Sequence, residues 1–165
     1  MKKLAVLVCL LVLASLAAAE GFEKGKIIVG PLVGLNWYSL AIGAQGEYGF
    51  TDKISGGGIA SYSSKSYNWG FGDDYKVTYI TIGAQGNYHF KPGQKFDPFA
   101  GAVFGYEVAS VTWPAGWPSY LSEPTYGGAF FGGNLGCNYD FSPTMLGRLQ
   151  VGYPYYFAAG VSFKF

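Results

Sequence analysis

The sequence has very few residues that could cross-link the chain. Its 165 residues include two cysteines, and Cys9 lies in an apolar N-terminal run that we expect to be removed. Cys137 is then the only thiol, which excludes an intramolecular disulfide. No small-residue lipobox precedes Cys9, which argues against a lipid-anchored N-terminus. The folded chain therefore needs another source of stability.

Charge and catalytic motifs are also scarce. Charged residues make up 13% of the chain and the formal net charge is +1, so a nucleic-acid-binding footprint is excluded. No His, Cys and carboxylate residues have metal-ligand spacing, and neither a nucleophile–base pair nor a Gly-rich phosphate loop can be proposed. We therefore expect no enzyme, no metal and no cofactor. The only histidine, His89, precedes the turn "KPGQK" and is expected to be an ordinary rim residue.

The first 19 residues have the features of a secretory signal peptide. Lys2 and Lys3 precede the apolar run "LAVLVCLLVLASL", and "AAA" before Glu20 offers a small-residue cleavage site. The run is too short for a membrane span and is followed by polar chain. We therefore predict a signal peptide at 1–19 and one mature domain at 20–165.

Glycine and aromatic residues are what the sequence has in excess. It contains 26 Gly, 14 Tyr and 13 Phe, and aromatics reach 19%. Glycine permits bends and close approach of strands, and aromatic residues favour wide strand surfaces. This composition favours a barrel of β-strands.

Alternation and turn signals predict eight strands along the mature chain. Short turns ("TDK", "KPGQK", "SPT") alternate with looser connections, the longest at 65–74 and 112–124. An even number of antiparallel strands with short turns at one end is the layout of a transmembrane β-barrel. The predicted strands are 26–36, 40–50, 54–64, 75–90, 96–111, 125–141, 145–153 and 157–165.

A repeated motif supports this layout. The segments "IGAQGEYGF" (42–50) and "IGAQGNYHF" (82–90) both end in Tyr-x-Phe before a tight turn, and "GNLGCNYDF" (133–141) repeats that ending. Outward aromatic pairs at one rim are what an aromatic girdle at a membrane interface requires. The predicted girdle is Tyr48, Phe50, Tyr88, Phe90, Tyr139 and Phe141.

The two faces of the strands decide between a membrane barrel and a water-soluble carrier. In 80–90, Ile80, Ile82 and Ala84 share one parity, and polar residues share the other. A charge that faces lipid at mid-depth costs about 2–4 kcal/mol, and on this register only Lys76, at a rim, has the lipid-facing parity. We therefore predict that the polar face lines the lumen. Its main residues are Gln45, Glu47, Gln85, Asn87, Glu107, Arg148 and Gln150.

Eight strands leave a lumen that side chains can just fill. We expect a polar plug in which Glu47 and Glu107 both compensate Arg148, the only arginine. The alternative for these three residues is a gated or proton-sensitive path.

The chain resembles the small eight-stranded outer-membrane β-barrel family of Gram-negative bacteria over 20–165. The resemblance rests on the signal peptide, the alternating strands and the final "VSFKF". It implies that Val161, Phe163 and Phe165 form a C-terminal signal for the barrel assembly machinery, after export by the Sec route. It also implies outer-membrane lipids as partners. The family is functionally mixed, so this fold does not supply a function.

The loops carry the remaining functional signal. Trp69, Trp113 and Trp117 fall at the long-loop end, and stiff aromatic loops can contact a protein, a glycan or a lipid headgroup. The alternative is an outer aromatic belt. Asp73 and Asp74 can hold a divalent cation or form a solvated acidic loop. Cys137 is expected to be a small apolar filler facing lipid.

Two functions therefore remain open: a monomeric structural or surface-interaction barrel, and a narrow channel for small, even hydrophobic, solutes. A third, a rim enzyme, has no supporting motif.

Overall fold

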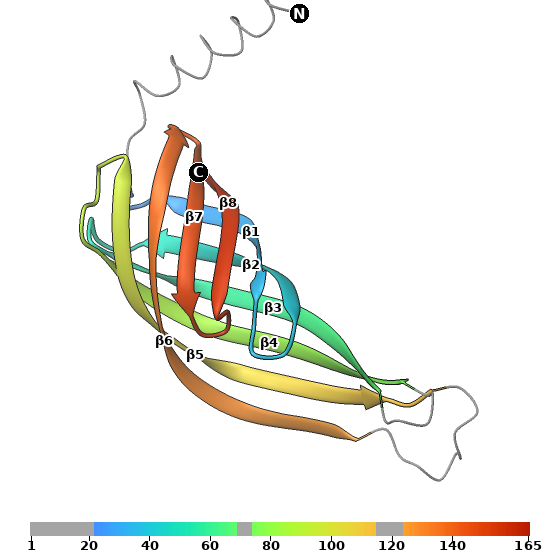
Figure 1. The fold of residues 1–165 in the computed structure, drawn as a ribbon. Coiled ribbons are helices and arrows are strands. Elements are labelled where there is room, and N and C mark those ends of the chain that lie inside the picture. Colours follow the sequence, from blue (N-terminus) through green and yellow to red (C-terminus); the bar gives the residue numbers. More distant parts are fainter. Residues whose placement is uncertain (1–21, 69–73, 115–123) are drawn as a thin grey trace, which may run out of the picture.

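The structure is a computed structural model that describes residues 22–68, 74–114 and 124–165. These residues form eight strands and no helix (Figure 1). Within the same ranges, no helix has the length and hydropathy needed to cross a membrane. The predicted signal peptide at 1–19 lies outside the described residues. The strands are β1 (Ile27–Leu35), β2 (Leu40–Gly49), β3 (Ile54–Asn68), β4 (Asp74–His89), β5 (Phe96–Thr112), β6 (Thr125–Ser142), β7 (Met145–Gly152) and β8 (Phe157–Lys164).

The strands close into one antiparallel barrel in sequence order, with β1 paired to β8. The predicted all-β, eight-stranded, up-and-down fold is confirmed. Backbone hydrogen bonds in both directions between Ile27 and Phe165 complete the closure next to the last strand. Every other ladder joins neighbours in the chain, so β1 and β8 form the one non-local seam of the barrel.

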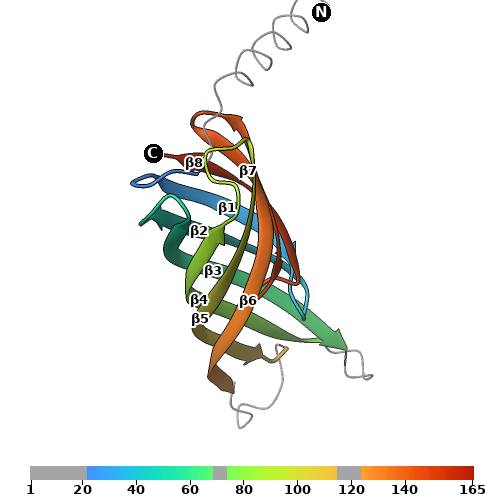
Figure 2. The same ribbon diagram turned by 90° about the vertical axis from the view of Figure 1, so that its left-hand side faces the viewer.

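The two ends of the barrel differ. Short turns at 50–53, 90–95 and 143–144 form the tight-turn end, and 36–39, 69–73, 113–124 and 153–156 connect strands at the long-loop end. Strands β3 to β6 have 15 to 18 residues, whereas the other four have 8 to 10. The longer strands continue past the others at the long-loop end (Figures 1 and 2).

The end of β3 differs from the prediction. We expected a loop from residue 65, but β3 continues to Asn68 and pairs with β4 as far as Asp74. Tyr67 and Tyr75 are directly opposite, with ring centroids 5.4 Å apart, and the Lys65 amine lies 5.1 Å from the centre of the Tyr67 ring. Such cross-strand aromatic pairs stabilise a ladder that polar composition alone does not suggest.

The outer wall is apolar and the inner face is polar. Ile82 and Phe104 are 65% and 61% exposed on the outside, whereas Gln85 is 5% exposed and Arg148 is 1% exposed. A water-soluble carrier would require the opposite arrangement. Toward the long-loop end, the apolar wall ends at Tyr62 and Ile80. The outward residues beyond them on β3 to β6 are mostly polar: Ser64, Ser66, Asn68, Asp74, Lys76, Thr78, Ser110, Thr112 and Thr125. Lys76 thus lies beyond the apolar band.

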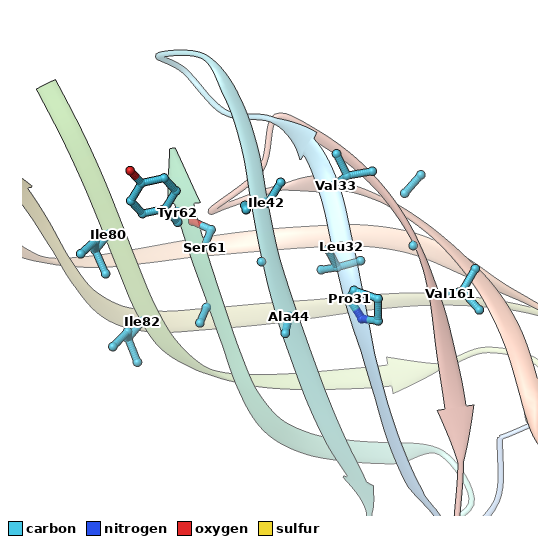
Figure 3. A pocket seen from close by; sticks show the side chains of 14 residues that line it. Pro31, Leu32, Val33, Ile42, Ala44, Ser61, Tyr62, Ile80, Ile82 and Val161 are labelled. Carbon is cyan, nitrogen blue, oxygen red and sulfur yellow. The ribbon is translucent and has the colours of Figure 1, made fainter. Parts of the chain in front are cut away.

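A shallow apolar groove of about 880 Å³ runs over the outer wall across β8, β1, β2, β3 and β4 (Figure 3). The groove forms because the outward residues along it are small, such as Ala44, Ala60 and Ala159. Larger side chains including Ile82 and Val161 stand at its sides. Lipid chains can therefore approach the strands closely here.

The groove lies over an interruption in the β1–β8 ladder. Only six residue pairs join these strands, and Gly30 and Pro31 are not among them, although pairing resumes in the same register at Leu32. Proline has no N–H to donate to a ladder. The seam is therefore weaker than the nine-pair β1–β2 ladder on the other side of β1.

An apolar layer crosses the lumen between its two polar regions. Along β5 the inward residues run from Asp97 through Val103 to Glu107, and Val103 is fully buried. Val103 belongs to a buried cluster with Leu32, Ala41, Ile59, Tyr155 and Ala158. The expected polar plug is therefore divided by an apolar floor.

Tyr155 completes this floor from a loop, not from a strand. It belongs to the 153–156 connection, is 1% exposed, and donates a hydrogen bond to the Ala60 carbonyl at 3.2 Å. A side chain at Gly43 would collide with its hydroxyl and with the Ala60 carbonyl oxygen. Glycine at this position lets the loop fold back into the barrel.

Candidate functional site

Glu47 is the centre of a buried polar network at the tight-turn end. Its carboxylate accepts hydrogen bonds from Ser55 at 2.8 Å and from the amides of Gln85 and Asn87, both at 2.9 Å. These donors come from β3 and β4, on which inward residues recur at every second position. Glu47 is 2% exposed, so its charge needs compensation inside the barrel.

Arg148 on β7 supplies that compensation. Its Nη1 lies 2.6 Å from Glu47 Oε1, and its Nε donates to Gln150 at 3.0 Å. With its amide oxygen turned toward the guanidinium, Gln45 accepts from Arg148 Nε at 2.8 Å. The guanidinium also lies over the Phe99 ring, 3.9 Å from its centre. The structure thus brings six of the seven predicted lumen residues into one network; Glu107 lies elsewhere.

His89 belongs to the same network, and the expectation of an ordinary rim residue is wrong. The side chain is fully buried, Nδ1 lies 2.5 Å from Asp97 Oδ2, and Nε2 lies 3.0 Å from Ser55 Oγ. Phe22, which precedes β1, covers the imidazole in a parallel stack with ring centroids 3.8 Å apart. Strand alternation places His89 on the inner face, but it does not show that Phe22 folds over it.

His89 also lies between two carboxylates. Nδ1 faces Asp97 Oδ2, and Nε2 lies 3.8 Å from Glu47 Oε2. Ser55 Oγ contacts both the imidazole and Glu47, so these four side chains form one continuous set of polar contacts.

Ser55, His89 and Asp97 have the order of contacts of a nucleophile–base–acid triad, but not its chemistry. The serine hydroxyl donates its proton to Glu47. All three side chains are buried, and Phe22 covers the imidazole. The arrangement is a structural hydrogen-bond relay.

Acidic and basic side chains are equal in number in the buried interior of this half. In the described part of the chain, the buried acidic and basic side chains are Glu47, Asp97, Asp140, His89, Arg148 and Lys164. Lys164 Nζ is 2.8 Å from Asp140 Oδ2. Because breaking a buried ion pair from one side costs about 3–5 kcal/mol, this network closes the tight-turn end firmly. Phe22, Ile28 and Leu146 form an apolar cluster beside it.

Glu107 faces the axis on the other side of the apolar floor, near the long-loop end. Its carboxylate accepts hydrogen bonds from Thr81 and Tyr153, both at 3.0 Å, and from Tyr38 at 3.3 Å. The expectation that it compensates Arg148 is wrong, because parity gives the side of a strand and not the depth along the barrel. In the described ranges, no ion pair to Glu107 occurs.

The two tyrosines that reach Glu107 from the loops have perturbed acidity. Burial, and next the negative charge of Glu107, raise the pKa of Tyr38 and of Tyr153 above the ordinary value. Both phenols therefore remain hydrogen-bond donors to the carboxylate throughout the neutral range.

A cavity of about 280 Å³ lies beside the Glu107 carboxylate. Phe130 and Tyr153 meet in its wall with ring centroids 4.2 Å apart. Its lining residues are Glu107, Ala109, Tyr126, Gly127, Gly128, Ala129, Phe130 and Tyr153.

Comparison with known proteins gives a match in structure alone. No protein-family model and no curated protein matches the sequence. The N-terminal β-barrel domain of OprF from Pseudomonas aeruginosa matches with a TM-score of 0.63 at 15% identity, over 86% of this chain and 98% of that one. The outer membrane protein OprG of the same organism matches with a TM-score of 0.61 at 16% identity, over 89% and 99%.

Ail, the attachment invasion locus protein of Yersinia pestis, in complex with the heparin analogue sucrose octasulfate, matches with a TM-score of 0.54 at 12% identity, over 87% and 100%. The chain has the fold of a small outer-membrane β-barrel. The resemblance inferred from the sequence is confirmed at this level. None of these three proteins is named as an enzyme.

The predicted girdle residues form three matching pairs on the outside of this barrel. Tyr48 and Phe50 meet edge to face at 5.3 Å, and Tyr88 and Phe90 do so at the same distance. The third pair, Tyr139 and Phe141, has the same geometry, with ring centroids 5.6 Å apart. The repeated Tyr-x-Phe motif thus produces one repeated contact beside each tight turn.

The C-terminal aromatics also face outward. Val161, Phe163 and Phe165 are 39%, 47% and 73% exposed on the same side of β8. Cys137 has the lipid-facing parity of β6 and is half-buried. Their assembly and filler roles remain predictions.

The loop residues are only partly described. Trp113 lies 5.6 Å from Tyr75 between ring centroids, and Asp74 is exposed at the start of β4. Trp69, Trp117 and Asp73 lie outside the described residues. Among the residues that the structure describes, no three His, Cys, Asp or Glu side chains are grouped as a metal site.

Proposed function

We propose that this protein is a monomeric outer-membrane β-barrel with a closed lumen, which acts as a structural or surface-interaction protein through its long-loop end. The apolar outer wall supports contact with outer-membrane lipids. The aromatic pairs at the tight-turn end fit a membrane interface. By this proposal the chain is exported with its signal peptide at 1–19 and inserted by the barrel assembly machinery.

The observation that carries a closed lumen is the combination of neutralised charges and an apolar floor. The Glu47–Arg148 pair fills the tight-turn half, and Val103 and Tyr155 lie across the axis above it. An ion that crossed this floor would lose its hydration without gaining a partner. The tight-turn half therefore supplies stability, and function belongs to the long-loop end.

The long-loop end is the surface for a partner outside the cell, either a protein or a glycan. Ail was solved with a polyanionic sugar analogue. The long-loop end of this barrel, which forms its mouth, instead presents Glu107 and the exposed Asp74. A partner of this chain therefore need not be anionic.

Single-channel recording in planar bilayers tests the closed lumen. Refolded wild-type protein is expected to give no steady openings, with heat-modifiable migration in gel electrophoresis as the control for a folded barrel. Steady openings that disappear in Arg148→Ala would contradict the proposal and assign a conducting path to the polar network.

A narrow channel for small solutes is the second candidate, and one observation favours it. The buried side-chain amides of Asn134 and Asn138 make no hydrogen bond within the described chain. Buried polar groups normally have partners, so these amides can face a hydrated path. The same recordings decide between the two functions.

A further inference from the structure

The mouth of the barrel contains a carboxylate without a basic partner. Three donors reach Glu107, and all three are neutral hydroxyls. In sequence, the outer segments 69–73 and 115–123 carry no Lys or Arg. Of the two lysines described at this end, Lys76 points outward and the Lys65 amine lies over the Tyr67 ring. A bound cation would complete the charge balance that the tight-turn half already has.

Aromatic side chains lie beside this charge. Tyr126, Phe130 and Tyr153 line the cavity beside Glu107. Tyr38, which donates to the carboxylate, stacks on Tyr79 with ring centroids 3.7 Å apart. Aromatic faces attract cations, most strongly alkylated ammonium groups in a cage of several rings. The contact of Lys65 with Tyr67 shows the same chemistry at the rim.

The space beside Glu107 exists because a side chain is missing. Gly128 is paired with Glu107 across β5 and β6 and shares the inward parity. A Cβ at Gly128 would meet no atom within 4 Å. The resulting 280 Å³ cavity suits a small ligand.

We propose that this cavity binds a small organic cation with an alkylated ammonium group, held by the Glu107 carboxylate and the rings of Tyr126, Phe130 and Tyr153. This inference names a ligand class for the long-loop end and so rests on the proposed surface role. A hard metal ion fits less well, because Ca²⁺ needs six to eight oxygen ligands and this wall is mostly aromatic. An anion would be repelled by Glu107.

Calorimetric titration of the refolded barrel with choline is the test, in a maltoside detergent that contains no choline group. Choline is expected to bind in the millimolar range or tighter. Its neutral carbon isostere, with a tert-butyl group in place of trimethylammonium, is expected to bind at least about tenfold more weakly. Equal binding of the two compounds would overturn the proposal.

Two variants test the site by independent means. Glu107→Gln removes the charge and is expected to weaken choline binding at least about tenfold. Gly128→Leu fills the cavity without changing charge and is expected to abolish binding. Asp52→Asn, which neutralises an exposed acid at the tight-turn end, is the control and should bind as the wild type does. Binding that survives both Glu107→Gln and Gly128→Leu would overturn the proposal.

Gel migration confirms that each variant is a folded barrel before titration. If Glu107→Gln does not fold, Gly128→Leu still decides the question. Glycerophosphocholine separates the two sources of the cation: binding as tight as that of choline assigns a lipid headgroup, and weaker binding assigns a free cation. A folded, non-conducting wild type that does not bind choline would overturn this site and leave the closed barrel standing.

Discussion

Glu47 and Glu107 both point to the axis of the same barrel, but their surroundings differ. Glu47 is 2% exposed and has an arginine, three neutral donors and the imidazole of His89 around it. Glu107 is half-buried and has only hydroxyl donors. One carboxylate has its charge neutralised by the protein, and the other retains it at a mouth that opens to solvent.

Because of this difference, the tight-turn half closes the barrel, whereas the long-loop end can bind a ligand. A fully compensated buried network resists both water and ions, because each member would lose its partners if the network opened. A carboxylate that is held in place by neutral donors keeps most of its attraction for an external cation. The apolar floor around Tyr155 keeps the two environments apart.

Removing Arg148 should have the largest effect on the tight-turn half. Arg148→Met leaves Glu47 charged and buried, and the free energy of unfolding is expected to fall by about 3–5 kcal/mol. Urea titration of the barrel in lipid vesicles measures this. Adding Glu47→Gln should recover much of the loss, since the orphaned charge is then gone. A double variant as unstable as Arg148→Met alone would show that packing of the guanidinium on Phe99 dominates instead.

Truncating Tyr155 should open the floor. Tyr155→Ala removes a buried ring and is expected to cost about 3 kcal/mol, measured by the same titration. It should also introduce conductance in planar bilayers, because the apolar layer is breached. Tyr155→Phe, which keeps the ring, should show no conductance. If Tyr155→Ala also shows no conductance, the charged network and not the apolar floor is the barrier to ions.

Neutralising Glu107 should hardly change stability. Glu107→Gln keeps a side chain of the same shape at a half-buried position, so we expect the free energy of unfolding to change by less than about 1 kcal/mol. Glu47→Gln is the matched substitution in the other half and should cost clearly more. Similar losses in the free energy of unfolding for the two variants would contradict the difference between the two regions.

Alkaline pH should affect the mouth through its tyrosines. The folded-state pKa values of Tyr38 and Tyr153 are raised above the ordinary value. A raised pKa contributes stability that is complete below the unfolded value, about 10, and is lost as the pH rises above it. The free energy of unfolding should therefore decline above about pH 10, and Tyr153→Phe should make that decline shallower. An unchanged slope would assign the loss to other groups.

The faces of the strands could be predicted from the sequence, because side chains alternate strictly along a strand. Ile82 and Gln85 lie on the predicted sides for this reason. Depth could not be predicted, since it depends on strand tilt and shear. That is why Glu107 was expected beside Arg148 and lies beyond the apolar floor.

Segments outside the strands account for two other differences. Phe22 covers His89, and Tyr155 enters the lumen from a loop, and neither follows an alternation that sequence reading can use. The end of β3 was missed because Ser, Lys and Asn predict a turn in isolation, whereas the Tyr67–Tyr75 contact extends the ladder.

The interrupted ladder between β1 and β8 has a consequence for how the barrel forms. Seven of the eight ladders are hairpins that close locally, while this one joins the first strand of the barrel to the last. Long-range pairing is slow because the entropy of closing a large loop is lost before any contact compensates it. With Pro31 removing a bond from that ladder, we expect the joining of the first strand to the last to be the slowest step of folding.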